Sequence, residues 1–119
     1  MTRKGSRPRR PRSTQPRPLP LVWSFRAIAD LEAIGEYISR DNPAAASRWV
    51  RGLLALAETA ALMPLVGRRV PEFEREDLRE VLQQNYRLVY RVASDRVEVL
   101  TVFEAHRLFP FQVEPPEES

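Results

Sequence analysis

Few residues of this chain have side chains that commonly carry out enzymatic chemistry. Its 119 residues include one histidine, His106, and no cysteine, so a metal site of histidine and cysteine ligands cannot be assembled within one chain. A carboxylate-only metal site is left open, but no motif points to one. Four scattered glycines, Gly5, Gly35, Gly52 and Gly67, exclude a phosphate-binding loop and a dinucleotide-binding fingerprint. The serines lack the turn that a triad with His106 would need, so we expect neither a cofactor nor a metal ion.

The positive charge of the chain is concentrated at its N-terminus. Residues 1–20 carry six arginines, one lysine, no acidic residue and five of the 11 prolines, a composition that predicts disorder. Between Leu21 and Pro110, 12 arginines face 13 acidic residues, so the net charge of +3 does not indicate a nucleic-acid-binding domain. The tail is interpreted as a basic arm that contacts phosphates, as a solvated extension, or as the product of a start codon assigned too far upstream.

Length and composition predict one small domain with two tails. We expect a disordered, Arg/Pro-rich basic tail over residues 1–20, a folded domain over 21–110 and an acidic tail over 111–119. The absence of cysteine is typical of an intracellular protein. No stretch approaches the roughly 20 apolar residues of a membrane span, and no secretory signal is present. These features predict a cytoplasmic protein without a membrane partner.

The first half of the folded part has the pattern of a short strand followed by two helices. Leu21–Trp23 is a short apolar run, and Ser24 can cap a helix over 25–40 whose apolar stripe is Ile28, Leu31, Ile34 and Ile38. Asn42-Pro43 starts a second helix that ends near Met63, before a proline. Its expected buried stripe is Ala46, Trp49, Val50, Leu53, Ala57 and Ala60. The short connection makes the two helices antiparallel.

After Gly67 the apolar residues alternate with a period of two, which predicts strands. We expect strands near 69–72, 78–84, 86–92 and 97–104. Leu88, Tyr90 and Val92 should share one face of their strand. Val97, Val99, Thr101 and Phe103 should share one face of the next. The predicted fold class is α+β, with an N-terminal strand and an antiparallel helical hairpin packed on a small, mainly antiparallel sheet.

The chain resembles the RelE/ParE toxins of bacterial type II toxin–antitoxin systems from about Leu21 to Pro110. The order, spacing and total length of the motifs carry the resemblance. They are W-S-F-R-A-I-A-D-L-E-A-I-G-E-Y-I at 23–38, D-N-P-A-A-A at 41–46, M-P-L-V-G-R at 63–68, L-R-E-V at 78–81, N-Y-R-L-V-Y-R-V at 85–92 and V-F-E-A-H-R at 102–107. The family fold, a helical hairpin against a small antiparallel sheet, agrees with the architecture predicted above.

The resemblance implies a growth-inhibiting toxin that is held inactive by a cognate protein antitoxin. ParE-like members poison DNA gyrase and are not nucleases, whereas RelE-like members cut mRNA in the ribosome. The near-neutral domain, and Leu78 and Glu80 at positions where the nucleases have lysines, favour the ParE-like branch. A RelE-like mRNA endonuclease and a decayed toxin that only binds antitoxin are the alternatives. A homodimer or a heterotetramer with the antitoxin is also open.

Three residues match catalytic positions of the nuclease branch. The resemblance implies that Arg87 and Arg107 clamp a phosphate and that His106 acts as a C-terminal catalytic histidine. Alternatively, Arg87 is an exposed strand residue paired with Glu80 or Glu98, and His106 is a solvated residue at a strand end.

Three aromatic residues and one acidic run have structural interpretations. Trp49 and Tyr90 are expected to be core residues, and Tyr86 to cap the turn. The acidic run at residues 72–77 is expected to be a solvated loop, or alternatively a contact for a basic partner.

Overall fold

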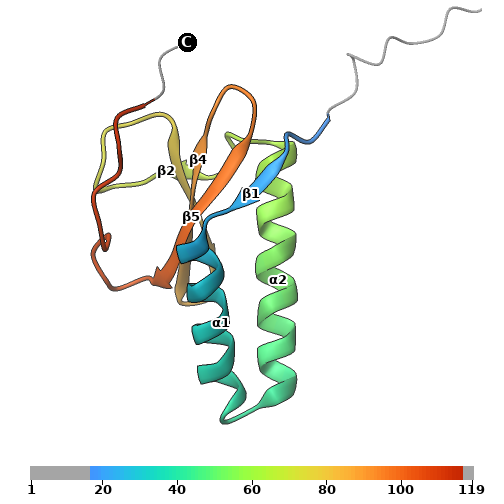
Figure 1. Ribbon diagram of the computed structural model, residues 1–119. Helices are drawn as coiled ribbons and strands as arrows, with labels where there is room; N and C mark the ends of the chain where they lie inside the picture. Colours follow the sequence, from blue (N-terminus) through green and yellow to red (C-terminus); the bar gives the residue numbers. More distant parts are fainter. Residues whose placement is uncertain (1–16, 117–119) are drawn as a thin grey trace, which may run out of the picture.

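The computed structural model describes residues 17–116. Two helices lie side by side and antiparallel against one sheet (Figure 1), which confirms the predicted α+β class. Of the predicted basic tail, residues 1–16 fall outside the described part. The elements in chain order are β1 (Leu21–Trp23), α1 (Phe25–Ser39), α2 (Pro43–Leu62), β2 (Arg68–Arg69), β3 (Leu78–Gln83), β4 (Tyr86–Val92) and β5 (Val97–Glu104).

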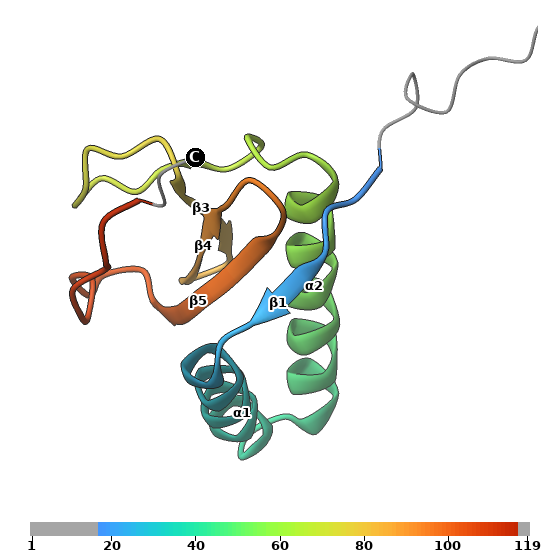
Figure 2. The same ribbon diagram turned by 45° about the horizontal axis from the view of Figure 1, so that its top comes forward.

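The five strands form one mixed sheet in the order β1-β5-β4-β3-β2. The pairing of β1 with β5 is parallel, and the other three pairings are antiparallel. The helices cover one face, and the loop before β3 and the C-terminal segment lie on the other side (Figure 2). The sheet is therefore mainly antiparallel, as predicted, and it separates two differently covered faces.

Both helices begin where the sequence places their caps. The Ser24 hydroxyl accepts a hydrogen bond from the Ala27 amide (3.0 Å) and donates one to the Leu100 carbonyl (2.9 Å). The Asn42 side chain accepts a bond from the Ala45 amide at 3.0 Å, and Pro43 occupies the first turn, where its missing N–H is not needed. These caps satisfy backbone groups that would otherwise be unpaired.

The core between helices and sheet contains the stripe predicted for α2, including Trp49, together with Leu88 and Tyr90 from β4. On α1 the predicted stripe is shifted by one residue at its start. Ala27 is fully buried, whereas Ile28 is 40% exposed. Buried Ala27 and the partly buried Leu31, Ile34 and Ile38 therefore form the core-facing stripe of α1, a spacing that keeps them on one helix face.

The prediction that Val97, Val99, Thr101 and Phe103 share one face of β5 is wrong for the second half of the strand. Val99 pairs with Tyr90 and Thr101 pairs with Val89, so Leu100 is an extra residue that forms a β-bulge. The extra residue shifts by one position the alternation of side chains between the two faces of the sheet. Val97, Val99 and Val102 consequently lie in the helix-side core, and Phe103 lies in a second cluster.

The first predicted strand of the second half is also shorter than expected. It was placed at 69–72, but β2 consists of Arg68 and Arg69 alone. Pro71 follows closely, and a proline cannot donate a ladder hydrogen bond. The two-residue strand therefore covers only Arg79 and Glu80 of β3.

Candidate functional site

Arg87, the first of the three predicted site residues, lies on β4 and is only 5% exposed. The expectation that it is an exposed strand residue is therefore wrong, while its predicted pairing with Glu80 is confirmed at 2.8 Å. The alternative partner, Glu98, instead binds Arg91 at 2.6 Å. Arg87 also stacks on Phe103, with its guanidinium carbon 4.6 Å from the ring centroid.

A second carboxylate holds the far side of the Arg87 guanidinium. Glu72 accepts two hydrogen bonds from it, at 2.6 and 2.9 Å, which is the bidentate geometry that arginine and carboxylate favour. The hydrogen bond from Arg87 holds the pKa of Glu72 below its ordinary value. The same bond, against the opposing effect of burial, raises the pKa of Arg87. The guanidinium is thus charged and fully matched by two carboxylates.

Arg68 is the fourth charged residue of this cluster, in addition to Arg87, Glu72 and Glu80. Glu80 has no exposed side-chain surface and accepts a second ion pair, from Arg68 at 2.6 Å. The cluster of Arg68, Glu72, Glu80 and Arg87 contains two positive and two negative charges. It is therefore electrically neutral, and we refer to it as the sealed cluster.

The C-terminal segment covers the sealed cluster. Glu72 accepts a bond from the Phe109 amide (3.2 Å), and the Arg107 carbonyl accepts one from Arg87 (3.2 Å). Phe109 packs edge-on against Phe73 and Phe103, at 5.0 and 5.7 Å between ring centroids. The segment 105–116, which we call the strap, thus closes the second face of the sheet.

The strap is also held beyond the predicted domain boundary at Pro110. Arg75 donates to the carbonyls of Val113 (3.4 Å) and Glu114 (2.7 Å) while it binds Asp77. Val113 packs against the second core cluster. The run 72–77 is therefore not a solvated loop as expected, because Glu72, Phe73 and Asp77 all make specific contacts.

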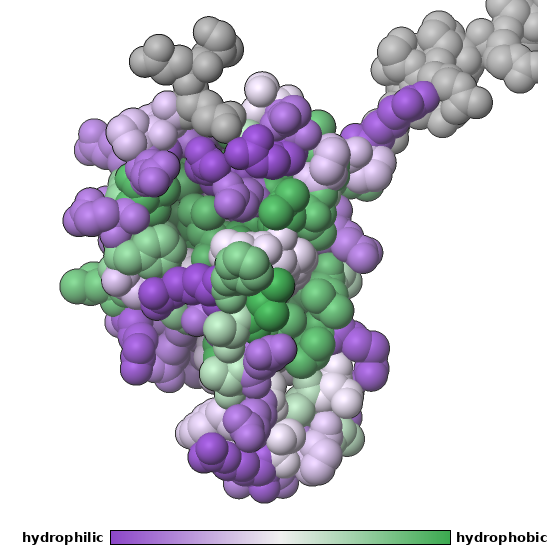
Figure 3. All heavy atoms as spheres, in the orientation of Figure 1, coloured by the Kyte–Doolittle hydropathy of each residue, from purple (hydrophilic) through white to green (hydrophobic). Residues whose placement is uncertain are grey.

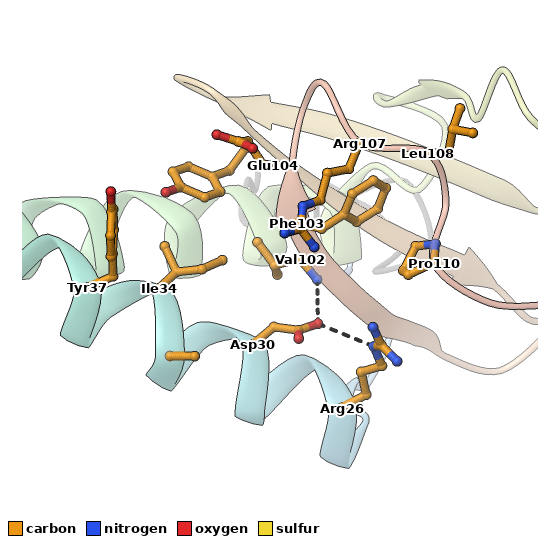
Figure 4. Close-up of a pocket in the computed structure, with 12 residues that line it drawn as sticks. Arg26, Asp30, Ile34, Tyr37, Val102, Phe103, Glu104, Arg107, Leu108 and Pro110 are labelled. Carbon is orange, nitrogen blue, oxygen red and sulfur yellow. Dashed lines mark hydrogen bonds and ion pairs between the residues drawn. The ribbon is translucent and has the colours of Figure 1, made fainter.

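Arg107 lies on the opposite side of the strap from these contacts. Its side chain lines a groove of about 600 Å³ between α1, the end of β5 and the strap (Figure 4). Within residues 17–116 its guanidinium has no hydrogen bond or ion pair. The groove is further lined by Arg26, Asp30, Ala33, Ile34, Tyr37, Tyr86, Val102, Phe103, Glu104, Leu108 and Pro110.

The floor of the groove is fixed by Asp30 on α1. One of its carboxylate oxygens accepts bonds from the Thr101 hydroxyl (2.6 Å) and the Val102 amide (3.0 Å). Asp30 thereby binds the strand directly after the bulge. Its only ion pair in the described part is with Arg26, at 3.8 Å.

Tyr37, Tyr86 and Glu104 give the groove aromatic and polar lining. Burial, followed by the charge of Glu104 and the neighbouring Tyr37, raises the pKa of Tyr86. Tyr37 is 66% exposed and Leu108 is 80% exposed. The groove thus combines a cation that forms no ion pair in the described residues with two phenols and exposed apolar side chains.

His106 is exposed and has no hydrogen-bond partner in the described part of the chain. The structure does not bring the three predicted residues into one site. Arg87 lies within the sealed cluster, Arg107 lines the groove, and Phe103 contacts both the Arg87 guanidinium and the groove. Residues 17–116 also contain no group of three or more acidic or histidine side chains that could hold a metal ion.

Sequence reasoning missed the two residues that define these surroundings. Glu72 belongs to the run expected to be a loop, and Asp30 is not among the predicted site residues. The i,i+4 spacing of Arg26 and Asp30 was a weak signal for Asp30. Nothing local to Glu72 indicates that it meets Arg87, 15 residues away.

The arginines of the folded part fall into two groups. Eight form an ion pair with a carboxylate. Considering only residues 17–116, four of those between positions 21 and 110 form none, and they are Arg40, Arg48, Arg51 and Arg107.

Figure 3 shows that hydrophobic side chains also gather over β1 and the adjoining helices, where Val22 and Ile28 are 43% and 40% exposed.

Comparison with known proteins gives one matching family. Residues 21–109 match the model described as "ParE toxin of type II toxin-antitoxin system, parDE". The Sinorhizobium fredii protein Y4kP is 36% identical over 90 residues, which cover 74% of this chain and 90% of that protein. Toxin RelE2 of Caulobacter vibrioides is 36% identical over 88 residues, covering 74% and 97%.

Two solved structures share the fold. One is described as the chromosomal ParDE TA system from P. aeruginosa, with a TM-score of 0.62, 22% identity and coverage of 74% of this chain and 97% of the other. The second is the toxin–antitoxin complex RelBE2 from Mycobacterium tuberculosis, with a TM-score of 0.53, 22% identity and coverage of 73% and 91%. In the described residues, no helix is long and apolar enough to cross a membrane.

Proposed function

This chain belongs to the ParE/RelE family of toxins of type II toxin–antitoxin systems, and from that premise we propose that it is a ParE-like toxin that poisons DNA gyrase and does not cut RNA. The observation that carries the proposal is that the charged guanidinium of Arg87 is buried and matched by two carboxylates. This arginine is the first residue that a nuclease of the family would need.

Cutting RNA requires a cation that stabilises the phosphate, together with groups that move protons to and from the sugar and leaving oxygens. In the sealed cluster both carboxylates already occupy the Arg87 guanidinium. A phosphate would have to displace Glu72, lose the Phe109 contact and approach the negative charge of Glu80. This arrangement opposes phosphate binding at Arg87.

The partner that restrains the toxin is, in this proposal, a cognate protein antitoxin. The groove offers Arg107, which forms no ion pair within residues 17–116, the phenols of Tyr37 and Tyr86, and an exposed Leu108. Ligand sites typically combine an apolar lining with a few polar groups in this way. We assign the groove to a segment of the antitoxin that carries apolar side chains and at least one acceptor group.

One observation favours the RelE-like alternative. Arg107 forms no ion pair within residues 17–116 and lines the same groove as two tyrosines, and a cation with aromatic rings can hold a nucleotide by its phosphate and base. The hypothesis of a RelE-like mRNA endonuclease therefore depends on Arg107, with His106 as a second candidate, and not on Arg87 alone.

Inducible expression of the full chain in a host without the antitoxin tests the proposal. Growth, mRNA integrity and plasmid supercoiling are followed for the wild type, Arg107→Ala and Arg87→Ala/Arg107→Ala. Arg107→Ala is included because removal of buried Arg87 can unfold the protein. Growth arrest with intact transcripts and gyrase-linked DNA breaks is the expected result.

Other outcomes identify the alternatives. Transcript cleavage that Arg107→Ala abolishes would overturn the ParE-like proposal in favour of the nuclease. Arrest with neither change would mean another target, and soluble protein that does not slow growth would mean a decayed toxin that only binds antitoxin.

A further inference from the structure

A second hollow adjoins the groove along α1. It measures about 300 Å³ and is lined by Ile38, Ala45, Arg48, Trp49, Gln83 and Gln84, and we call it the notch. Tyr86 of the groove lies edge-on against Trp49 of the notch, with 5.2 Å between ring centroids. Ile34 lines the groove and Ile38, one helical turn later, lines the notch. The two hollows thus share the Trp49–Tyr86 pair as a wall.

The notch is rich in hydrogen-bond donors. Arg48 forms no ion pair within residues 17–116, and the two glutamine carboxamides are beside it. Trp49 is 3% exposed, and its indole nitrogen is buried without a hydrogen-bond acceptor. A buried donor without an acceptor is costly and calls for an explanation. No carboxylate lines the notch, so the group that it fits is an acceptor with negative charge.

The backbone holds these donors together. Gln83 lies against Gly52 of α2, where an added Cβ would lie 2.3 Å from the Gln83 amide nitrogen. Only a glycine therefore lets the helix approach the Gln83 side chain this closely. Gln84 begins the turn to β4 with a φ of 54°, a left-handed conformation that is uncommon for a residue with a side chain.

We propose that the notch binds a carboxylate side chain of the antitoxin segment that occupies the groove, with Arg48 as the cationic anchor. This inference rests on the proposed function. The antitoxin is the chosen occupant because the notch lies next to the groove assigned to it, across the Trp49–Tyr86 contact. A nucleic acid fits less well, because its affinity comes from many neutralised phosphates and the notch offers one arginine.

Affinity measurements on the full chain and the antitoxin encoded beside it test this assignment. Arg48→Gln is expected to raise Kd about tenfold and Arg48→Glu about a hundredfold, because an enclosed charge pair is lost and then becomes repulsive. Arg40→Glu is the matched control. Within the described residues Arg40 likewise forms no ion pair. It lies close to the turn between the helices but does not line the notch, and Kd should change less than about threefold.

Two further measurements separate the notch from general charge effects. Gly52→Ala keeps every charge but displaces the Gln83 amide, so a several-fold rise in Kd is expected with no loss of thermal stability. In the NMR spectrum of the complex, the Trp49 indole N–H should shift on antitoxin binding to the wild type and not to Arg48→Gln. The indole of Trp23, the other tryptophan, serves as the internal reference.

Equal losses with Arg48→Glu and Arg40→Glu would overturn the inference, as would a Kd that Arg48→Glu leaves unchanged. If Arg107→Glu weakens the complex while Arg48→Glu does not, the groove assignment stands and the notch alone fails. If the wild-type chain binds no antitoxin, the proposed partner and the notch fail together.

Discussion

The two sides of the strap use the same residue type in opposite ways. On the side of the sealed cluster, Arg87 is 5% exposed and held by two carboxylates. On the side of α1, Arg107 lines an open groove and has no carboxylate partner in the described part of the chain. An arginine that is matched internally contributes to the fold, whereas an unmatched arginine beside apolar side chains is available to a partner.

The same contrast extends to the sheet and the helices. The strand arginines Arg79 and Arg91 have close ion pairs, at 2.7 and 2.6 Å. On the helices, Arg26 has one contact at 3.8 Å, and Arg48 and Arg51 have none within residues 17–116. Within residues 17–116, the sheet arginines of this chain are thus paired with carboxylates, whereas Arg48 and Arg51 on the helices are not.

Glu80→Ala should have the largest effect, because it breaks the sealed cluster at its centre. The Glu80 side chain is completely buried and bound by Arg68 and Arg87. Its removal leaves a buried guanidinium with one of its two partners, which is expected to cost about 3–5 kcal/mol in the free energy of unfolding. Urea denaturation at neutral pH measures this.

The control for this variant is Glu98→Ala. Glu98 is partly exposed and pairs with Arg91, so its removal should cost less than about 1 kcal/mol. Equal losses for the two variants would show that burial of the charge cluster has no special role in holding the sheet face.

Glu72→Gln should have the next largest effect, and this effect depends on pH. The hydrogen bond from Arg87 lowers the pKa of Glu72 below its ordinary value in the folded protein. A lowered folded-state pKa adds stability above the unfolded pKa, and this stability is lost as the pH falls through the folded pKa. The variant should lose about 1–2 kcal/mol at neutral pH and differ little from the wild type in strong acid.

Denaturation curves measured from neutral pH down to about pH 3 follow this difference. Glu74→Gln is the matched control, since Glu74 is an exposed glutamate of the same loop and forms no ion pair in the part that the structure describes. A constant difference between Glu72→Gln and the wild type across this range would contradict the linkage to Arg87.

The helical half could be predicted from sequence because its signals are local. Ser24 and Asn42 cap their own helices, and the stripe around Trp49 follows from periodicity. The bulge at Leu100 could not be predicted. It is fixed by hydrogen bonds from Thr101 and Val102 to Asp30, 71 and 72 residues away.

The candidate site was less predictable for the same reason. The family motif identified Arg87 and Arg107 as residues of interest, but exposure and charge matching depend on contacts distant in sequence. Arg87 meets Glu72 across 15 residues and the Arg107 carbonyl across 20. Sequence patterns report the local period of a strand and not which loop folds over it.

Arg75→Ala tests whether the strap is an integral part of the sealed side. Arg75 links Asp77 to the carbonyl of Glu114, so its removal should cost about 1 kcal/mol. The larger change is expected in hydrogen exchange, where the Phe109 amide, which donates to Glu72, should lose protection before the sheet does.

Arg69→Ala removes a more exposed arginine, paired with Glu76, and should leave exchange in the strap unchanged. If exchange in the strap is also unchanged in Arg75→Ala, the aromatic contacts and the hydrogen bonds with Glu72 and Arg87 hold the strap, and Arg75 contributes nothing to the sealed side.

Arg107→Ala should have the smallest effect on stability and thereby defines the open side. No charge partner is lost, because the guanidinium forms no ion pair within residues 17–116, so the free energy of unfolding should change by less than about 0.5 kcal/mol. Affinity for the antitoxin should nevertheless fall about tenfold, and the salt dependence of binding should weaken. Arg91→Ala, which removes a paired arginine, should show the reverse pattern. A marked loss of stability in Arg107→Ala with unchanged affinity would place Arg107 with the structural arginines and remove the distinction between the two sides of the strap.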